Sequence, residues 1–135
     1  MKNISLVIIL VISAVLVYSC GKADDIITPT HYSRVPRPIN LTASFDTTST
    51  GKYRVSINWV VESIENLKDY EIYRGVNNGS LFFLFGGINS TNYTDSTLST
   101  STDSLKLAYF VNGRGIDRFV GQSSDTIKII VTKTF

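Results

Sequence analysis

The stretch Tyr53-Arg54-Val55-Ser56-Ile57-Asn58-Trp59 decides the fold. Large apolar side chains occupy every second position, and polar side chains occupy the positions between them. Successive side chains of a β-strand leave opposite faces of a sheet, so this period predicts a strand with one face in the core and one in water. Trp59, the only tryptophan of the chain, ends the apolar series and is expected at the centre of the core.

The same period of two continues along the chain from Ile39 onward. It predicts further strands at these places: Ile39 to Phe45, Tyr70 and Ile72, Leu81 to Phe85, around Tyr93, Leu105 to Val111, and Ile127 to Val131. Clusters rich in Asn, Gly, Ser and Thr separate these segments, as is typical of turns. Glu62 to Leu67 is compatible with a helix but is too short to compete. About seven short strands at this spacing predict an all-β, seven-stranded antiparallel sandwich of the immunoglobulin-like type.

Several short motifs follow one another in this region: Pro38-Ile39-Asn40-Leu41, Ile57-Asn58-Trp59, Tyr70-Glu71-Ile72-Tyr73-Arg74, Asn92-Tyr93-Thr94-Asp95 and Tyr109-Phe110-Val111. As an ordered set they resemble a fibronectin type III domain, from about Pro36 to Phe135. The resemblance implies that Trp59 is the core tryptophan of the second strand. The family usually has a tyrosine at the position of Leu107, where its hydroxyl ties down the preceding loop. We therefore expect apolar packing to hold this corner, more loosely than in the family.

The first twenty residues have the pattern of an export signal. Lys2 precedes an uncharged apolar run that closes on Val17-Tyr18-Ser19-Cys20, as in a secretory signal with small residues before its cleavage site. The four residues Val17-Tyr18-Ser19-Cys20 at the end of this run resemble the lipobox of bacterial lipoproteins. That resemblance implies that residues 1–19 are removed and that Cys20 becomes the acylated N-terminus. A transmembrane anchor is the alternative, but the uncharged stretch barely reaches the roughly 20 residues that cross a bilayer.

Residues 20–37 are expected to form a flexible, lipidated tether, and residues 38–135 the single domain. Prolines at positions 29, 36 and 38 argue against a helix here. A flexible chain of this length spans about 20–25 Å on average and no more than about 60 Å when stretched. The opening Gly21-Lys22-Ala23-Asp24-Asp25 is similar to a signal that sends some Gram-negative lipoproteins to the outer face of the outer membrane. We expect outer-membrane anchoring, with the surface side favoured. The alternative is that these charges carry no signal, because any exposed tether is charged.

Composition argues against several classes of function. The formal net charge is +2, and removal of Lys2 leaves +1, so the chain has no basic field for nucleic acid. The only cysteine is used by the lipid, which leaves none for a zinc site or a thiol nucleophile. His31, the only histidine, lies in the tether and is poorly placed for a Ser-His-Asp arrangement. Asp24 and Asp25 supply too few ligands for calcium. We predict no catalytic residue, no cofactor and no metal.

The strongest candidate for a binding surface is a run of five bulky apolar residues: Leu81, Phe82, Phe83, Leu84 and Phe85. An edge strand buries only one face, so at least two of these side chains should point outward. The alternative is that they cover a corner of a small core. Strict alternation places Phe82 with Leu84 on one face and Phe83 with Phe85 on the other, and one of these pairs is expected to be buried.

Two weaker candidates lie in the expected loop after the sixth strand. Arg114-Gly115-Ile116-Asp117 resembles the Arg-Gly-Asp loop of some family members, but the inserted Ile116 changes the spacing of the two charges and favours an ordinary turn. Phe119 and Val120 would form either an apolar loop tip or the start of the last strand, and the second is favoured.

Together these features predict a non-catalytic, membrane-anchored lipoprotein whose fibronectin type III-like domain binds a protein partner or serves as an accessory subunit of an envelope assembly. The alternative is a surface lipoprotein that binds a polysaccharide and works with an outer-membrane transporter. Exposed aromatic platforms would favour the polysaccharide, and a self-complementary apolar edge would favour a protein partner. The oligomeric state stays open.

Overall fold

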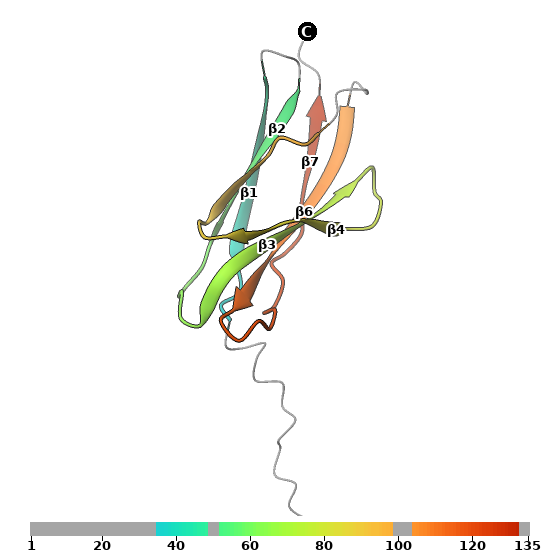
Figure 1. Ribbon diagram of the computed structural model, residues 1–135. Helices are drawn as coiled ribbons and strands as arrows, with labels where there is room; N and C mark the ends of the chain where they lie inside the picture. The colour runs from blue at the N-terminus through green and yellow to red at the C-terminus, as the bar shows by residue number, and fades with distance from the viewer. Residues whose placement is uncertain (1–34, 49–51, 99–103, 133–135) are drawn as a thin grey trace, which may run out of the picture.

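The computed structural model describes residues 35–48, 52–98 and 104–132, which form two antiparallel sheets packed face to face (Figure 1). The strands are β1 (Ile39–Thr47), β2 (Tyr53–Val60), β3 (Leu67–Val76), β4 (Phe82–Ile88), β5 (Asn92–Asp95), β6 (Ser104–Gly115) and β7 (Ile127–Thr132). One sheet has the order β1-β2-β5 and the other the order β4-β3-β6-β7. The prediction of a seven-stranded antiparallel sandwich is confirmed.

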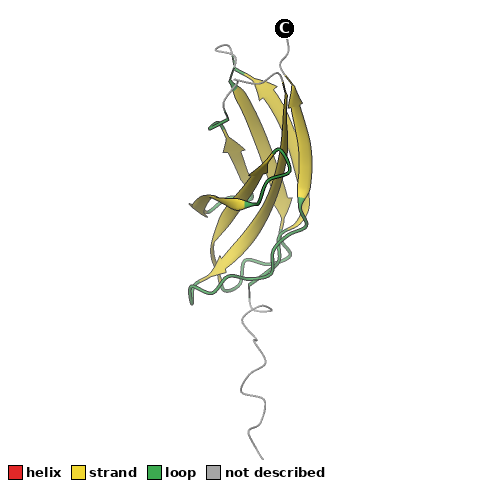
Figure 2. Cartoon of the chain, turned by 90° about the vertical axis from the view of Figure 1, so that its right-hand side faces the viewer, coloured by secondary structure: helices red, strands yellow, loops and turns green. Residues whose placement is uncertain are grey.

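The described residues contain strands and loops, and Figure 2 shows no helix among them. The segment Glu62 to Leu67, which is compatible with a helix, forms a loop that leads into β3. No helix within the described ranges is long and apolar enough to cross a membrane. Cys20, His31 and the expected signal over residues 1–19 lie outside the described residues.

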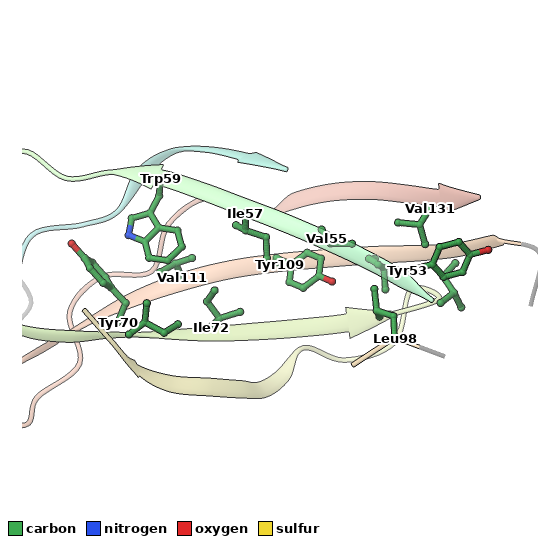
Figure 3. Close-up of a cluster of buried hydrophobic side chains, with 13 residues drawn as sticks. Tyr53, Val55, Ile57, Trp59, Tyr70, Ile72, Leu98, Tyr109, Val111 and Val131 are labelled. Carbon is green, nitrogen blue, oxygen red and sulfur yellow. The ribbon is translucent and has the colours of Figure 1, made fainter. Parts of the chain in front are cut away.

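The alternation in β2 produces the core that the sequence predicts. Tyr53, Val55, Ile57 and Trp59 are at most 3% exposed, while the side chains between them reach the outer face of the sheet. They pack against inward side chains of the facing sheet, as Figure 3 shows for Trp59 and Tyr70. These two rings meet edge to face with centroids 5.1 Å apart, a favourable arrangement for aromatic pairs. Trp59 therefore lies in the core, as expected.

Strand β4 forms one edge of the four-stranded sheet, and two β-bulges interrupt its pairing with β3. Ile72 pairs with Phe85 and Tyr73 with Phe83, so Leu84 is an extra residue between them. A second shift leaves Gly87 as the extra residue, with φ +73°, a conformation that glycine adopts without steric cost. A bulge changes which face the following side chains leave from, so β4 does not alternate strictly.

The compact part of the chain begins before the expected boundary at residue 38. Val35 is 2% exposed and fills a socket made by three glycines that have no side chain to occupy it. A Cβ added at these glycines would lie within 2.8 to 3.0 Å of Val35 side-chain atoms: Gly113, Gly115 and Gly121. Residues 35–37 therefore belong to the domain and not to a free tether. The expected boundary at residue 38 lies three residues too late, because the three glycines that receive Val35 are far away in the sequence and no local pattern links them to it.

Candidate functional site

The edge strand β4 exposes more aromatic surface than any other strand of the described domain. Phe82 is 70% exposed, Phe83 58% and Phe85 50%. Leu81 and Leu84 are partly buried, and Leu84 packs against the core. Three of the five predicted residues thus present large apolar side chains to solvent, one more than the edge-strand argument requires. Their part in binding stays a prediction.

The expectation that one alternating pair would be buried is wrong. Phe82 is the most exposed of the five, although its expected companion Leu84 contacts the core. The bulge at Leu84 also separates Phe83 from Phe85. Phe83 shares a face with its partner Tyr73, whereas Phe85 pairs with the buried Ile72.

Three aromatic rings line up across the outer face of strands β4, β3 and β6. Phe83 meets Tyr73 edge to face, with centroids 5.8 Å apart. Tyr73 in turn stacks on Phe110, with centroids 4.6 Å apart and an interplanar angle of 7°. Burial, helped by the nearby charge of Glu71, raises the pKa of the Tyr73 phenol. Its hydroxyl donates a hydrogen bond of 3.3 Å to Glu71 Oε2. We call Phe82, Phe83, Phe85, Tyr73 and Phe110 together the β4 patch.

At the inner side of the same edge, Phe85 stacks on Tyr93 of β5, with centroids 5.4 Å apart and an interplanar angle of 23°. Tyr93 itself packs against the core. Phe85 therefore contacts Tyr93 with one part of its ring and is 50% exposed to solvent. It is the residue of the β4 patch that lies next to the core.

A groove of about 610 Å³ adjoins the β4 patch on the other side of the β3–β4 hairpin. Gly75 and Ala108 are paired across β3 and β6 and line the groove. Because glycine has no side chain and alanine has only a methyl group, the two residues leave this space open. A Cβ on Gly75 would lie 3.0 Å from the Gly79 carbonyl oxygen, so the hairpin folds closely over this position. Lys106 and Lys128 also line the groove, and neither forms an ion pair with another residue of the described part.

The structure also shows a buried polar network that the sequence did not predict. Asp95 is fully buried and accepts hydrogen bonds from Arg74 Nη1 at 2.7 Å and from the Tyr109 hydroxyl at 2.8 Å. The backbone N–H and the hydroxyl of Thr97 donate to its other oxygen at 3.0 and 2.8 Å. Burial by itself would raise the pKa of the Asp95 carboxyl, but these donors outweigh it and hold the pKa below its usual value.

A pattern in the sequence does point to this network. Arg74 continues the inward series of Tyr70 and Ile72 in β3, and Asp95 continues the inward series of Tyr93 in β5. Opposite charges at inward positions of two strands in facing sheets indicate an ion pair. The partners lie 21 positions apart, which is why local motifs did not reveal them.

The same network corrects the expectation for the corner near Leu107. Leu107 is 2% exposed and contributes apolar packing, as expected. The segment after β5 is also tied by Asp95, which bonds Thr97 on its own side and Tyr109 on β6. Apolar packing therefore does not hold this corner alone, because a tyrosine two positions after Leu107 reaches a buried carboxylate.

The loop candidates after β6 have both been resolved by the structure. The Arg114 guanidinium donates to both carboxylate oxygens of Asp69 at 2.8 and 2.6 Å, and Asp117 accepts from the backbone N–H of Phe119. Both charges are therefore engaged within the domain. Arg114 and Gly115 end β6 instead of lying in the loop, and the turn that was expected is formed by Ile116 and Asp117. Phe119 and Val120 lie in the loop before β7, which begins only at Ile127. Their favoured assignment to the start of the last strand was wrong, because Val120 makes only an isolated bridge to Arg114.

No group of three or more His, Cys, Asp or Glu side chains in the described ranges is placed to hold a metal ion. Asp69 and Glu71 share Arg114 as their cationic partner. The candidate site is therefore a surface of aromatic rings beside a groove flanked by lysines.

No protein-family model and no curated protein matches the chain. Among solved structures, an Fn3-like protein from Clostridium thermocellum is 24% identical, with a TM-score of 0.51 over 67% of this chain and 86% of that one. The sixth fibronectin type III domain of human fibronectin type III domain containing protein 3 is 16% identical, with a TM-score of 0.56 over 75% of this chain and 89% of that one. The fold is fibronectin type III-like.

A further similarity concerns part of a much larger protein. A β-1,2-glucanase from Parabacteroides distasonis is 18% identical, with a TM-score of 0.52 over 75% of this chain but 14% of that one. At this identity the likeness shows the shared fold.

Proposed function

We propose that this protein is a non-catalytic lipoprotein that is anchored by Cys20 in the outer membrane, on its surface side, and binds a protein partner through the β4 patch. The observation that carries the binding part is the exposure of Phe82, Phe83 and Phe85 on one edge strand, at 70, 58 and 50%. Interface cores are enriched in aromatic side chains and depleted of charge. An edge strand also offers unpaired backbone groups to an added strand.

The arrangement of the rings favours a protein over a polysaccharide. A sugar ring packs on the open face of an aromatic ring. Tyr73 and Phe110 stack at an interplanar angle of 7°, so each covers one face of the other, and Phe85 and Tyr93 stack in a similar way. Stacking thus leaves each of these four rings at most one open face for a sugar, whereas the exposed Phe82 and Phe83 present apolar surface that suits a protein partner.

The neighbouring groove supports the same proposal and adds a preference for charge. Lys106 and Lys128 beside a groove of about 610 Å³ attract a partner with a carboxylate near an apolar side chain. Such a partner would cover the β4 patch and reach past the β3–β4 hairpin at the same time.

The test compares two variants of the full chain in capture of partners from detergent-extracted envelopes. Phe82→Ser/Phe83→Ser should keep the melting temperature within a few degrees, because both side chains are more than half exposed, and should lose the captured protein. Val60→Ser is the matched control, since Val60 is 51% exposed and lies on the three-stranded sheet. Capture of the same protein by both variants would contradict the proposal. Retention on immobilised polysaccharide that the double variant alone loses would favour the alternative ligand.

A further inference from the structure

The domain has one end at which the chain enters and at which two loops meet. Val35 sits in the glycine socket beside Gly115, and the Ile116 N–H donates to the Asn66 carbonyl at 3.0 Å. The loop between β2 and β3 therefore touches the loop between β6 and β7 next to the entering chain. Figure 1 shows these loops at the lower end, at the start of β1, whereas β7 ends at the upper end. We call this the entry end.

The loops of the entry end carry large apolar side chains at their tips. Ile64 is 76% exposed, Ile116 68% and Phe119 53%. Ile64 belongs to the β2–β3 loop, and the other two belong to the β6–β7 loop. Side chains this exposed contribute little to the core of the domain. Their apolar character therefore suggests that they contact a surface outside the domain.

The charges around these tips do not form a basic field. Glu62, Glu65 and Asp117 are exposed there, against Arg118 and Lys68. The Asp117 carboxylate is also partly engaged by the Phe119 N–H. A strongly anionic surface would therefore be no better a partner than a neutral one.

We infer that the entry end lies against the membrane that holds the chain, with Ile64, Ile116 and Phe119 inserted into the interfacial region of its lipid leaflet. This inference rests on the proposed anchor at Cys20. Fourteen residues separate Cys20 from Val35, which limits the distance between the lipid and the entry end to about 50 Å. A tethered contact is intramolecular, so weak apolar insertion becomes sufficient to orient the domain. The β4 patch then stays clear of the bilayer for its partner.

The experiment places a tryptophan reporter at the tip or away from it. Mature, acylated full chain carrying Ile116→Trp is reconstituted in phosphatidylcholine vesicles whose acyl chains are brominated near the headgroup, because bromine quenches tryptophan on contact. Ile130→Trp is the matched control: Ile130 is 56% exposed but lies on β7, toward the other end of the domain. Wild-type chain measures the signal of Trp59, which is 3% exposed.

An inserted tip lies about 5–10 Å into the interface, so the emission from position 116 should fall by about half or more while that from position 130 hardly changes. Adding Ile64→Ser and Phe119→Ser should restore most of the emission from position 116. Equal quenching at both positions, or none at either, would overturn the inference. Shielding of position 116 from acrylamide that rises with protein-to-lipid ratio, without bromine quenching, would assign the tips to a second copy of the chain.

Flotation of the same vesicles separates failure of the anchor from failure of this inference. A chain that does not float with the vesicles refutes both the anchor and the inference. A chain that floats but shows no quenching at position 116 refutes the inference and leaves the proposed anchor and protein partner standing.

Discussion

Replacing the buried carboxylate in Asp95→Asn should destabilise the domain by about 3 kcal/mol at pH 7. Removing one partner of a buried ion pair costs about 3–5 kcal/mol, because the other charge is left uncompensated. The low end applies because the Arg74 side chain is 21% exposed and recovers some water, whereas Asp95 is fully buried. Asn keeps the size of the side chain, so the change measures the charge and its hydrogen bonds and not a cavity.

Urea unfolding of the full chain, followed by tryptophan fluorescence, measures this loss. With a slope of about 1.5 kcal/mol per molar urea, a loss of 3 kcal/mol moves the midpoint down by about 2 M. Asp125→Asn is the matched control: Asp125 also pairs with an arginine, but its side chain is 96% exposed. The control should leave the midpoint unchanged, since exposed pairs contribute little.

The pH dependence gives a second, independent check on Asp95. Despite the burial of this group, hydrogen bonds from Arg74, Thr97 and Tyr109 hold the pKa of the Asp95 carboxyl in the folded state below its usual value, so the folded protein holds the proton less tightly than the unfolded chain. The stabilisation is therefore present above about pH 4 and is lost as the pH falls through the folded pKa. The difference between wild type and Asp95→Asn should narrow below about pH 4. A difference under about 1 kcal/mol at pH 7, or one that stays constant on acidification, would refute the network as a source of stability.

Three further predictions concern the core, the socket and the anchor. Trp59→Ala should cost about 3–5 kcal/mol as a large-to-small core change, and a melting temperature within a few degrees of wild type would contradict its central place. Gly113→Ala should cost about 1–3 kcal/mol through overpacking against Val35, because the added carbon would lie 2.8 Å from Val35 Cγ1; in a double-mutant cycle Val35→Ala, which removes that Cγ1, should relieve part of that cost, and simple additivity would argue against the socket. Cys20→Ser should leave the chain unprocessed or soluble, and a mature-sized species that still fractionates with membranes would rule out lipid attachment at this residue.

The buried face of a single strand could be predicted from the sequence, because the alternation of apolar and polar residues along that strand determines it. The alternation of Tyr53, Val55, Ile57 and Trp59 fixes which face of β2 is buried whatever the neighbouring strands do. The same reasoning placed Tyr70 and Ile72 inside, and the spacing of strands and turns indicated a sandwich. The run from Leu81 to Phe85 identified an edge strand with surplus apolar surface.

The arrangement of the site depended on relations between strands that no local pattern contains. The bulge at Leu84 arises from the register of β4 against β3, and it decides that Phe83 joins Tyr73 on the outer face while Phe85 does not. The contact of Asp95 with Arg74 joins residues 21 positions apart.

What the sequence by itself determined was therefore the class of fold, the identity of the core residues and the presence of an apolar edge, because the period of side chains along a strand follows from backbone geometry alone. Only the tertiary structure decided which rings form one surface, where the domain begins and which loops share the entry end. Val35 meets Gly113, Gly115 and Gly121 across nearly eighty positions or more of the chain, and such meetings depend on how the two sheets close on one another.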